Sequence, residues 1–536
     1  MFTPVSDVGR AAGLLTADCP KTPLFYTQSI LVFYNVKVCA ANDEAPRKPT
    51  GQTRSMIGTV HPSTLPFHST AIQHLTMAIW ECDFDECDRS SVRTHGDCVL
   101  CDHHFCMKHL GTEYHTCPTW EDEKQYHPAA QEAEKKEITT LIEKINISAL
   151  TQRASSLRNG IACSMVQDLH YDRALRSSVM GGRNYHIEIS FEDGISWLAR
   201  IRRFNATSPP PRLRDYILGS EVSTLQFLSK TKVPVPAVFD FNFDASNPVG
   251  VGYILMEKLP GKSLQWSLAT QEQKQKITSQ LVDIYIELKR YPFPMMGSFD
   301  PQNSSHIGPI ARESLADFQD LKMRMLGLFT SPEEYFEAHI RLILDSILRQ
   351  EYYVNRPVDA FLIHRFLLES LPKVFSEKTL DDGMFYLKHA DEKGDQILVD
   401  NDFNITCIID WEWAQTDSKS AAFNSPIVLL PVADFYEGAD YIGEDEDFFA
   451  KCLEEKGHPD LGEIVRNGRL LHRIQFCCGY DLDDWDGFIG LFFGLLKILG
   501  IEGVSTWESW KADALKCYRE DDQLKQLLKM SELTST

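Results

Sequence analysis

Several features are scarce in this chain of 536 residues, and each scarcity excludes a class of protein. No run of about 18 uncharged apolar residues occurs, because the apolar stretch 24–38 is interrupted by polar side chains, so no membrane span is predicted. Basic residues are also in deficit, since 54 Lys and Arg face 76 Asp and Glu for a formal net charge of -22. That charge repels phosphates at long range, which argues against the whole chain wrapping nucleic acid or an anionic membrane.

The N-terminus lacks the basic start and small-residue cleavage site of a secretory signal, because Asp7 precedes the first arginine. We therefore expect an intracellular protein, cytoplasmic or also nuclear. Hydrophobic residues make up 43% of the chain and charged residues 24%, which is ordinary globular usage. At this length we expect one principal folded domain of several hundred residues with smaller appendages.

The pattern of apolar residues changes several times along the chain. Alternating apolar residues over 185–191, followed by the turn signal Asp193-Gly194, predict a β-hairpin. Beyond residue 264 the apolar spacing becomes helical. The predicted units are an unassigned, poorly ordered stretch 1–76, a cysteine-rich unit 79–120, a helical linker 121–160, a β-rich lobe 161–262, a helical lobe 263–520 and a tail 521–536.

Six of the 14 cysteines and two histidines fall into four closely spaced pairs. The pairs are Cys82 and Cys87, Cys98 and Cys101, Cys106 and His109, and His115 and Cys117. Thiolate and imidazole donors suit zinc, and eight ligands fill two closed tetrahedral sites with no position left for a substrate. A segment this short has too little core to fold without metal. The alternative is a chance cluster of core thiols, which paired spacing of eight ligand types makes hard to reach.

The spacing resembles the AN-one-type zinc finger, in which the ligand pairs interleave. The resemblance implies that one zinc ion is held by the first and third pairs, Cys82, Cys87, Cys106 and His109. It implies that the other is held by Cys98, Cys101, His115 and Cys117. The first pair departs from the usual pattern, because four residues separate its cysteines instead of two. The acidic residues around the pairs oppose phosphate contacts, so we expect a protein partner and no nucleic acid.

Two aspartates lie at the ends of neighbouring predicted strands. Asp391 follows a strand at 384–387, and Asp410 ends a strand that pairs with 397–400 across a tight turn. Phosphoryl transfer needs such a pair, since one carboxylate orients or deprotonates the attacking hydroxyl and the other holds magnesium on the nucleotide. The alternative for Asp410 is a carboxylate that merely caps a turn.

These residues resemble the aminoglycoside phosphotransferase and choline kinase-like family, which is related in fold to protein kinases. The match consists of His389-x-Asp391, Ile397 to Asp400 and Ile408 to Glu412, in the family's order. It implies an α+β, two-lobed protein-kinase-like fold over roughly residues 165–520. It also implies ATP and magnesium as cofactors and Asp391 as the catalytic base.

The resemblance extends to a nucleotide site in the β-rich lobe. It implies that Gly181 and Gly182 form the loop over the phosphates, that Arg200 contacts the phosphates, and that Glu221 is the helix partner of Arg200. The stretch 253–261, with Glu257 and Leu259, resembles the hinge that meets adenine. The alternatives are a plain turn at the glycine pair and a surface charge at Arg200.

One position departs from the family pattern. The asparagine expected five residues after the catalytic aspartate, a second magnesium ligand, is replaced by Gln396 and preceded by Asp395. Glutamine keeps an amide oxygen but reaches one methylene further, so magnesium would be held by Asp410 with Gln396 or Asp395. We therefore expect a phosphotransferase acting on a hydroxyl of a small molecule. The alternative is a catalytically weak or inactive pseudokinase that serves as a binding or scaffold protein.

Overall fold

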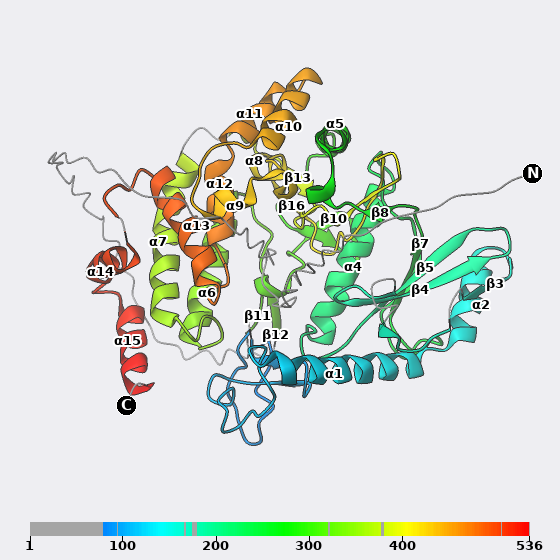
Figure 1. The fold of residues 1–536 in the computed structure, drawn as a ribbon, viewed down its shortest axis with the longest axis horizontal. Coiled ribbons are helices and arrows are strands. Elements are labelled where there is room, and N and C mark those ends of the chain that lie inside the picture. Colours follow the sequence, from blue (N-terminus) through cyan, green and yellow to red (C-terminus); the bar gives the residue numbers. More distant parts are fainter. Residues whose placement is uncertain are drawn as a thin grey trace, which may run out of the picture.

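The computed structural model describes residues 79–93, 95–165, 168–173, 179–319, 322–376, 380–504 and 506–534. The predicted poorly ordered stretch, residues 1–76, lies outside the described residues. The fold is α+β: a β-sheet on one side faces a group of helices on the other, with α4 (Pro211–Leu228) between them (Figure 1). Within the residues described, no helix combines the length and apolar character needed to cross a membrane.

The N-terminal unit contains one small hairpin, β1 (Asp97–Cys98) and β2 (His103–His104). Gly96 is required at the start of this hairpin, because a Cβ atom there would lie 2.2 Å from the carbonyl oxygen of Val92. Two helices follow, α1 (Glu123–Lys144) and α2 (Ile147–Leu157). Their apolar residues Ile138 and Leu150 are fully buried in a cluster with residues of the large sheet. The stretch predicted as a linker is therefore packed on the β-rich lobe.

The large sheet is antiparallel, with strand order β3-β4-β5-β7-β6. The predicted hairpin is present as β4 and β5, and Gly194 in its turn has a φ of 84°, which glycine adopts without strain. Alternate residues of β4, such as Ile187 and Ile189, are fully buried, which explains the alternating pattern. The strands are β3 (Cys163–Met165), β4 (Asn184–Phe191), β5 (Ser196–Arg202), β6 (Val238–Asn242) and β7 (Tyr253–Glu257).

Short strand pairs connect the sheet to the helices. The predicted pairing of 397–400 with the strand before Asp410 is confirmed, since β14 (Ile397–Val399) pairs antiparallel with β15 (Ile405–Ile408). On its other edge β14 pairs with β8 (Lys262–Ser263), just after the predicted hinge. The remaining pairs are β9 (Ser298–Asp300) with β10 (Asn303–Gly308), β11 (Ala316–Gln319) with β12 (Lys322–Met325), and β13 (Phe385–Lys388) with β16 (Gln415–Ser418).

The C-terminal half is mostly helical, as the apolar spacing predicts. The helices are α5 (Gln271–Leu288), α6 (Pro332–Leu348), α7 (Pro357–Ser376), α8 (Lys419–Ala422), α9 (Val432–Tyr436), α10 (Glu444–Glu455), α11 (Pro459–Asn467), α12 (Arg469–Cys477), α13 (Trp485–Ile498), α14 (Trp507–Cys517) and α15 (Asp522–Thr534), with short 3-10 turns at Trp266–Leu268, Glu313–Leu315 and Ile427–Leu429. One large core cluster contains residues of α6, α7, α12, α13, α14 and α15.

The stretch 521–536, predicted as a tail, instead contains α15. Leu524 and Leu527 of this helix are 1% and 2% exposed and belong to the main core of the helical lobe. Their spacing of three residues places both side chains on one helix face, which packs on α7. Burial of this face, rather than helix propensity alone, holds the C-terminal helix in place.

Candidate functional site

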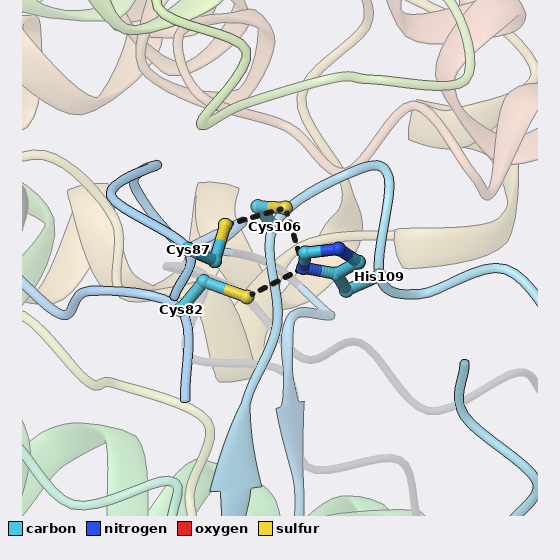
Figure 2. A group of neighbouring side chains, drawn as sticks. All are labelled: Cys82, Cys87, Cys106 and His109. Atoms are coloured by element: carbon cyan, nitrogen blue, oxygen red, sulfur yellow. Dashed lines mark hydrogen bonds between the residues drawn. The ribbon is translucent and has the colours of Figure 1, made fainter. Parts of the chain in front are cut away.

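The eight predicted zinc ligands lie in two groups of four. One group contains Cys82, Cys87, Cys106 and His109, and the other contains Cys98, Cys101, His115 and Cys117; these are the two sets that the resemblance implies. Within each group the candidate ligand atoms all lie within 4.8 Å of one another. Figure 2 shows the first group, in which three sulfur atoms and the His109 ring converge on one point.

The separations within the groups fit a tetrahedral metal. In the first group the Cys82 Sγ to His109 Nδ1 distance is 3.3 Å, and the Cys87 Sγ to Cys106 Sγ distance is 3.9 Å. In the second, Cys101 Sγ lies 3.7 Å from His115 Nε2. A zinc ion bonded to sulfur at about 2.3 Å sets its ligands about 3.8 Å apart, so the donor set and its spacing fit zinc. Both sites are closed by protein ligands, which is typical of a structural ion.

Asp391 and Asp410 lie in two loops that one histidine joins. The Nε2–H of His389 donates to the carbonyl oxygen of Ile409 at 2.7 Å, and its Nδ1 accepts the backbone N–H of Asp391 at 3.3 Å. This hydrogen-bond pattern assigns the neutral tautomer with the proton on Nε2. The ring also packs against Trp411, with 4.6 Å between the ring centroids. His389 therefore fixes the position of the Asp391 loop relative to Asp410.

The backbone at Asp410 and directly before Asp391 is in an uncommon conformation. Ala390, which precedes Asp391, has a φ of 67°, and Asp410 itself has a φ of 66°. Left-handed conformations of non-glycine residues cost energy and cluster at active sites, where the surrounding structure enforces them. Two of them in adjacent loops indicate that the positions of the carboxylates are constrained.

Lys393 lies beside the candidate base, and the motif comparison did not identify it. Its Nζ is 3.2 Å from Asp391 Oδ2. Burial raises the pKa of Asp391 above its ordinary value, the positive charge of Lys393 acts in the opposite direction, and the charge of Asp410 adds to the rise. A carboxylate with a raised pKa next to a cation is a suitable proton acceptor near neutral pH.

Arg200 is buried, so the surface-charge alternative is wrong. Its guanidinium, 7% exposed, forms an ion pair with Glu221 of α4 and a 3.1 Å contact with Glu412, and it lies 3.7 Å from Asp410. The structure therefore brings Arg200, Glu221 and Asp410 together across the junction between sheet and helices. Because both terminal nitrogens of Arg200 already face carboxylates, a phosphate would share them.

Two further arginines, Arg202 and Arg183, lie beside the carboxylate of Glu412. Arg202 contacts Glu412 with two hydrogen bonds of 2.7 and 2.9 Å. Arg183, directly after the glycine pair, forms an ion pair with Glu313, lies 3.8 Å from Glu412 and stacks over the Trp413 ring. Although burial opposes ionisation of Glu412, Arg202, Arg183 and Arg200 lower its pKa to about 2. Sequence reasoning missed Arg183, because contacts across 130 and more residues have no local signal.

The glycine pair and the hinge lie where the β-rich lobe meets the helices. Gly181 donates its N–H to the Asn184 carbonyl at 3.0 Å, and Gly182 accepts from Arg203, so the pair forms the turn that enters β4. Glu257 ends β7, and its carboxylate accepts the Ala237 N–H at 3.3 Å. Leu259 is half-buried in the segment between β7 and β8.

The three predicted magnesium ligands, Asp410, Gln396 and Asp395, differ in how accessible they are to a cation. The Asp410 carboxylate is 53% exposed and available to a cation. Gln396 is buried, and its Oε1 accepts the Gly394 N–H at 2.7 Å, so the amide oxygen is already used within the loop. Asp395 is exposed. The carboxylates of Asp410 and Asp395 are therefore suitable magnesium ligands. The Gln396 side chain instead lines a cavity behind the loop, together with Tyr285 and Trp411.

Comparison with known families defines the class of this part of the chain. Residues 181–417, somewhat less than half of the chain, match the model of the phosphotransferase enzyme family. The match spans the glycine pair, the Arg200 strand and both aspartates. The resemblance inferred from the motifs is therefore confirmed for this segment, which is similar to the phosphotransferase enzyme family.

Individual relatives are more distant. The chain is 34% identical over 121 residues to a subtelomeric hrmA-associated cluster protein of Aspergillus fumigatus, which is found in two strains. This alignment covers 22% of the present chain and 23% of that protein. It thus spans about a quarter of the length of these curated relatives. Among solved structures, aminoglycoside phosphotransferase APH(4)-Ia matches 67% of this chain and 99% of its own with 14% identity and a TM-score of 0.37. Aminoglycoside 2'-phosphotransferase-IIIa matches 66% and 99% with 16% identity and a TM-score of 0.36.

Proposed function

We propose that this protein transfers the γ-phosphoryl group of ATP to a hydroxyl group of a small molecule. The observation that carries the proposal is the convergence of Asp391, Asp410 and Arg200, from three separate elements, on one junction of the fold. Asp391 is the base, Asp410 holds magnesium, and Arg200 faces the phosphates. The family match supports a phosphotransferase, while the acceptor, ATP and magnesium are part of the proposal.

The roles follow from charge and position. Asp391 accepts the proton of the acceptor hydroxyl as its oxygen attacks, and Lys393 at 3.2 Å keeps the carboxylate ionised before attack. Arg183, Arg200 and Arg202 offer three positive charges, but Glu221, Glu313, Glu412 and Asp410 offer four negative ones. Bound magnesium would supply the cationic charge that the phosphates require at this acidic site.

A second candidate is a nucleotide-binding protein without turnover. It is favoured by Gln396, because its amide oxygen accepts a hydrogen bond from Gly394 where the family pattern has a magnesium ligand. In this alternative the domain binds nucleotide and the zinc finger contacts a protein partner.

The experiment uses the full chain with Mg-ATP and a panel of alcohols, and it measures nucleotide binding and phosphoryl transfer separately. Asp391→Asn should keep nucleotide affinity within about threefold and lower transfer by about 10²–10⁴-fold, since only the base is lost. Asp410→Asn should weaken the magnesium-dependent part of nucleotide binding. Binding without transfer to any alcohol would favour the second candidate, and absence of nucleotide binding would refute both.

A further inference from the structure

A cavity beside Asp391 contains polar groups without partners. It has a volume of about 80 Å³, several times the ~10–15 Å³ that one water needs. Ala390 and Glu392, on either side of Asp391, line it together with Gln415 and Asp417 from β16. The cavity thus lies between the loop of the proposed base and the segment that follows the proposed magnesium ligand.

Arg312 is one of two cationic side chains that line this cavity, the other being Lys388. Its side chain is 8% exposed, Nη2 donates to the Trp413 carbonyl over 3.5 Å, and Nε has no hydrogen-bond partner. Among the described residues, no carboxylate forms an ion pair with this guanidinium. A buried cation without a counter-charge is costly, whereas a carboxylate of a ligand would satisfy it.

Two acceptors in the same cavity also lack donors. Gln415 Nε2 donates to Asp417 Oδ2 at 3.3 Å, which fixes the amide and leaves its Oε1 without a partner. His472 donates from Nε2 to the Ser425 carbonyl at 3.1 Å, which leaves Nδ1 as an unpartnered acceptor. Both side chains are more than nine-tenths buried. Hydroxyl or ammonium groups of a ligand would satisfy these two acceptors.

We propose that this cavity binds the phosphate acceptor, and that the acceptor is a small hydroxylated acid, with or without an amino group. Its carboxylate faces Arg312, and its donor groups face Gln415 and His472. The inference rests on the proposed function: the acceptor hydroxyl oxygen bonds to the γ-phosphorus, the bond to the β-phosphate oxygen breaks, ADP leaves, and Asp391 takes the hydroxyl proton. The charged residues lining the cavity are two of each sign, Arg312, Lys388, Glu392 and Asp417, so a polycation is not favoured.

The test measures binding and transfer with matched compounds. The panel contains hydroxy acids (glycerate, malate), hydroxy amino acids (serine, homoserine), neutral polyols (glycerol, erythritol) and amino alcohols (choline, ethanolamine). Calorimetry with Asp391→Asn gives acceptor binding, and ADP release with mass spectrometry of the ester gives transfer. We expect both binding and transfer with the acids. Comparison of the hydroxy acids with the hydroxy amino acids shows whether the acceptor needs an amino group.

Arg312→Gln should weaken binding of the acid about 10- to 100-fold, the range for a lost hydrogen bond to a charged group, with ATP affinity unchanged. Gln415→Leu tests the opposite side of the cavity and should also weaken acid binding. Arg341→Gln, on the exposed surface of α6, is the control that should leave it unchanged. Transfer only to polyols or amines, or acid binding that Arg312→Gln leaves intact, would overturn this inference and leave the proposed function standing. Acid binding that depends on Arg312 without any transfer would support the cavity and contradict the proposed function.

The zinc finger carries a second, independent inference, because it contacts both sides of the kinase-like fold. On the helical side Arg93, 6% exposed, donates to Glu351 Oε2 at 2.9 Å, to Asp317 Oδ1 at 2.7 Å and to the Ala316 carbonyl at 2.8 Å. Its backbone N–H donates to the Glu351 carbonyl at 2.7 Å. A buried arginine that donates several hydrogen bonds is typical of a stable, specific interface.

On the side of the sheet, the finger reaches the start of α4. His104 Nε2 lies 2.8 Å from the Ala206 carbonyl, in the connection between β5 and α4. Ile79, which precedes the first zinc ligand, packs with Leu213 and Ile217 of α4 and with Ala316 of β11. In Figure 1 the blue loops of the finger lie below β11 and β12, between the sheet and the helices.

The geometry points to the finger as an internal brace that holds α4 against the helical lobe. α4 carries Glu221, whose ion pair with Arg200 builds the proposed nucleotide site. The zinc-stabilised finger, through Arg93 and Ile79, fixes the helix that positions this pair. The partner of this finger surface is therefore the chain's own phosphotransferase domain.

The test compares Arg93→Ala and the double variant Cys98→Ser with Cys101→Ser against Glu113→Ala, an exposed control in the finger. Hydrogen exchange over residues 211–228 and nucleotide affinity are measured on the full chain. We expect faster exchange in α4 and a nucleotide Kd raised about tenfold for the first two variants, with the control unchanged. Loss of zinc with unchanged exchange in α4 and unchanged Kd would overturn the brace. Arg93→Lys, which keeps the charge but loses the planar fork, should fall between the wild type and Arg93→Ala.

Discussion

Glu412 offers the most direct test of the electrostatic organisation of the site. The carboxylate is 5% exposed and faces Arg202, Arg200 and Arg183 at 2.7, 3.1 and 3.8 Å. Glu412→Gln keeps the shape of the side chain but leaves three guanidinium groups, those of Arg200 and Arg202 buried and that of Arg183 half-buried, without this counter-charge. Breaking a buried pair by removing one partner costs about 3–5 kcal/mol, and we expect a loss of unfolding free energy in that range.

The pKa of Glu412 gives the pH dependence of this loss. Folding lowers this pKa from 4.5 to about 2, and at 1.36 kcal/mol per unit the change corresponds to about 3 kcal/mol. The sign follows from the depressed pKa: the stabilisation is fully present above pH 4.5 and is lost as the pH falls towards 2. The advantage of the wild type over Glu412→Gln should therefore be constant from pH 7 to about 5 and shrink below it.

Urea unfolding of both proteins between pH 7 and pH 3 measures this difference. The control is Glu337→Gln, which makes the same substitution at an exposed ion pair with Arg341 and should cost less than about 0.5 kcal/mol. A Glu412→Gln protein within 1 kcal/mol of the wild type at pH 7 would refute the reasoning. So would a difference that stays the same below pH 4.5.

Three further predictions concern other parts of the chain. Elemental analysis should find two zinc ions per chain, and Gly96→Ala, whose Cβ would meet the Val92 carbonyl at 2.2 Å, should lower that number. Leu527→Ala should reduce the free energy of unfolding by about 2–5 kcal/mol, whereas Leu528→Ala, at a 36% exposed position, should have a smaller effect; equal effects would contradict the packing of α15. Gln396→Leu should destabilise the protein by about 1–3 kcal/mol through the lost bond to Gly394, yet change the half-saturating magnesium concentration of transfer less than tenfold; a larger change would place its amide on the metal.

The sequence alone determined the features that short-range patterns encode. Paired spacing of cysteine and histidine identified the eight candidate zinc ligands, because a small metal site depends on local ligand spacing. Alternating and helical apolar periods located the β4–β5 and β14–β15 hairpins and the larger helices, because each period follows directly from backbone geometry. The ordered motif around Asp391 and Asp410 indicated the kinase-like fold that the family match supports.

The tertiary structure decided which long-range partners these residues have. Arg183 meets Glu313 and Glu412 across 130 and more residues, and Arg93 meets Glu351 across 258, so neither contact leaves a trace in local spacing. The burial of α15 depends in the same way on the face of a distant helix. Charge and polarity are written in the sequence, but whether a charged side chain is solvated or buried opposite a counter-charge is set only by the packing of remote segments.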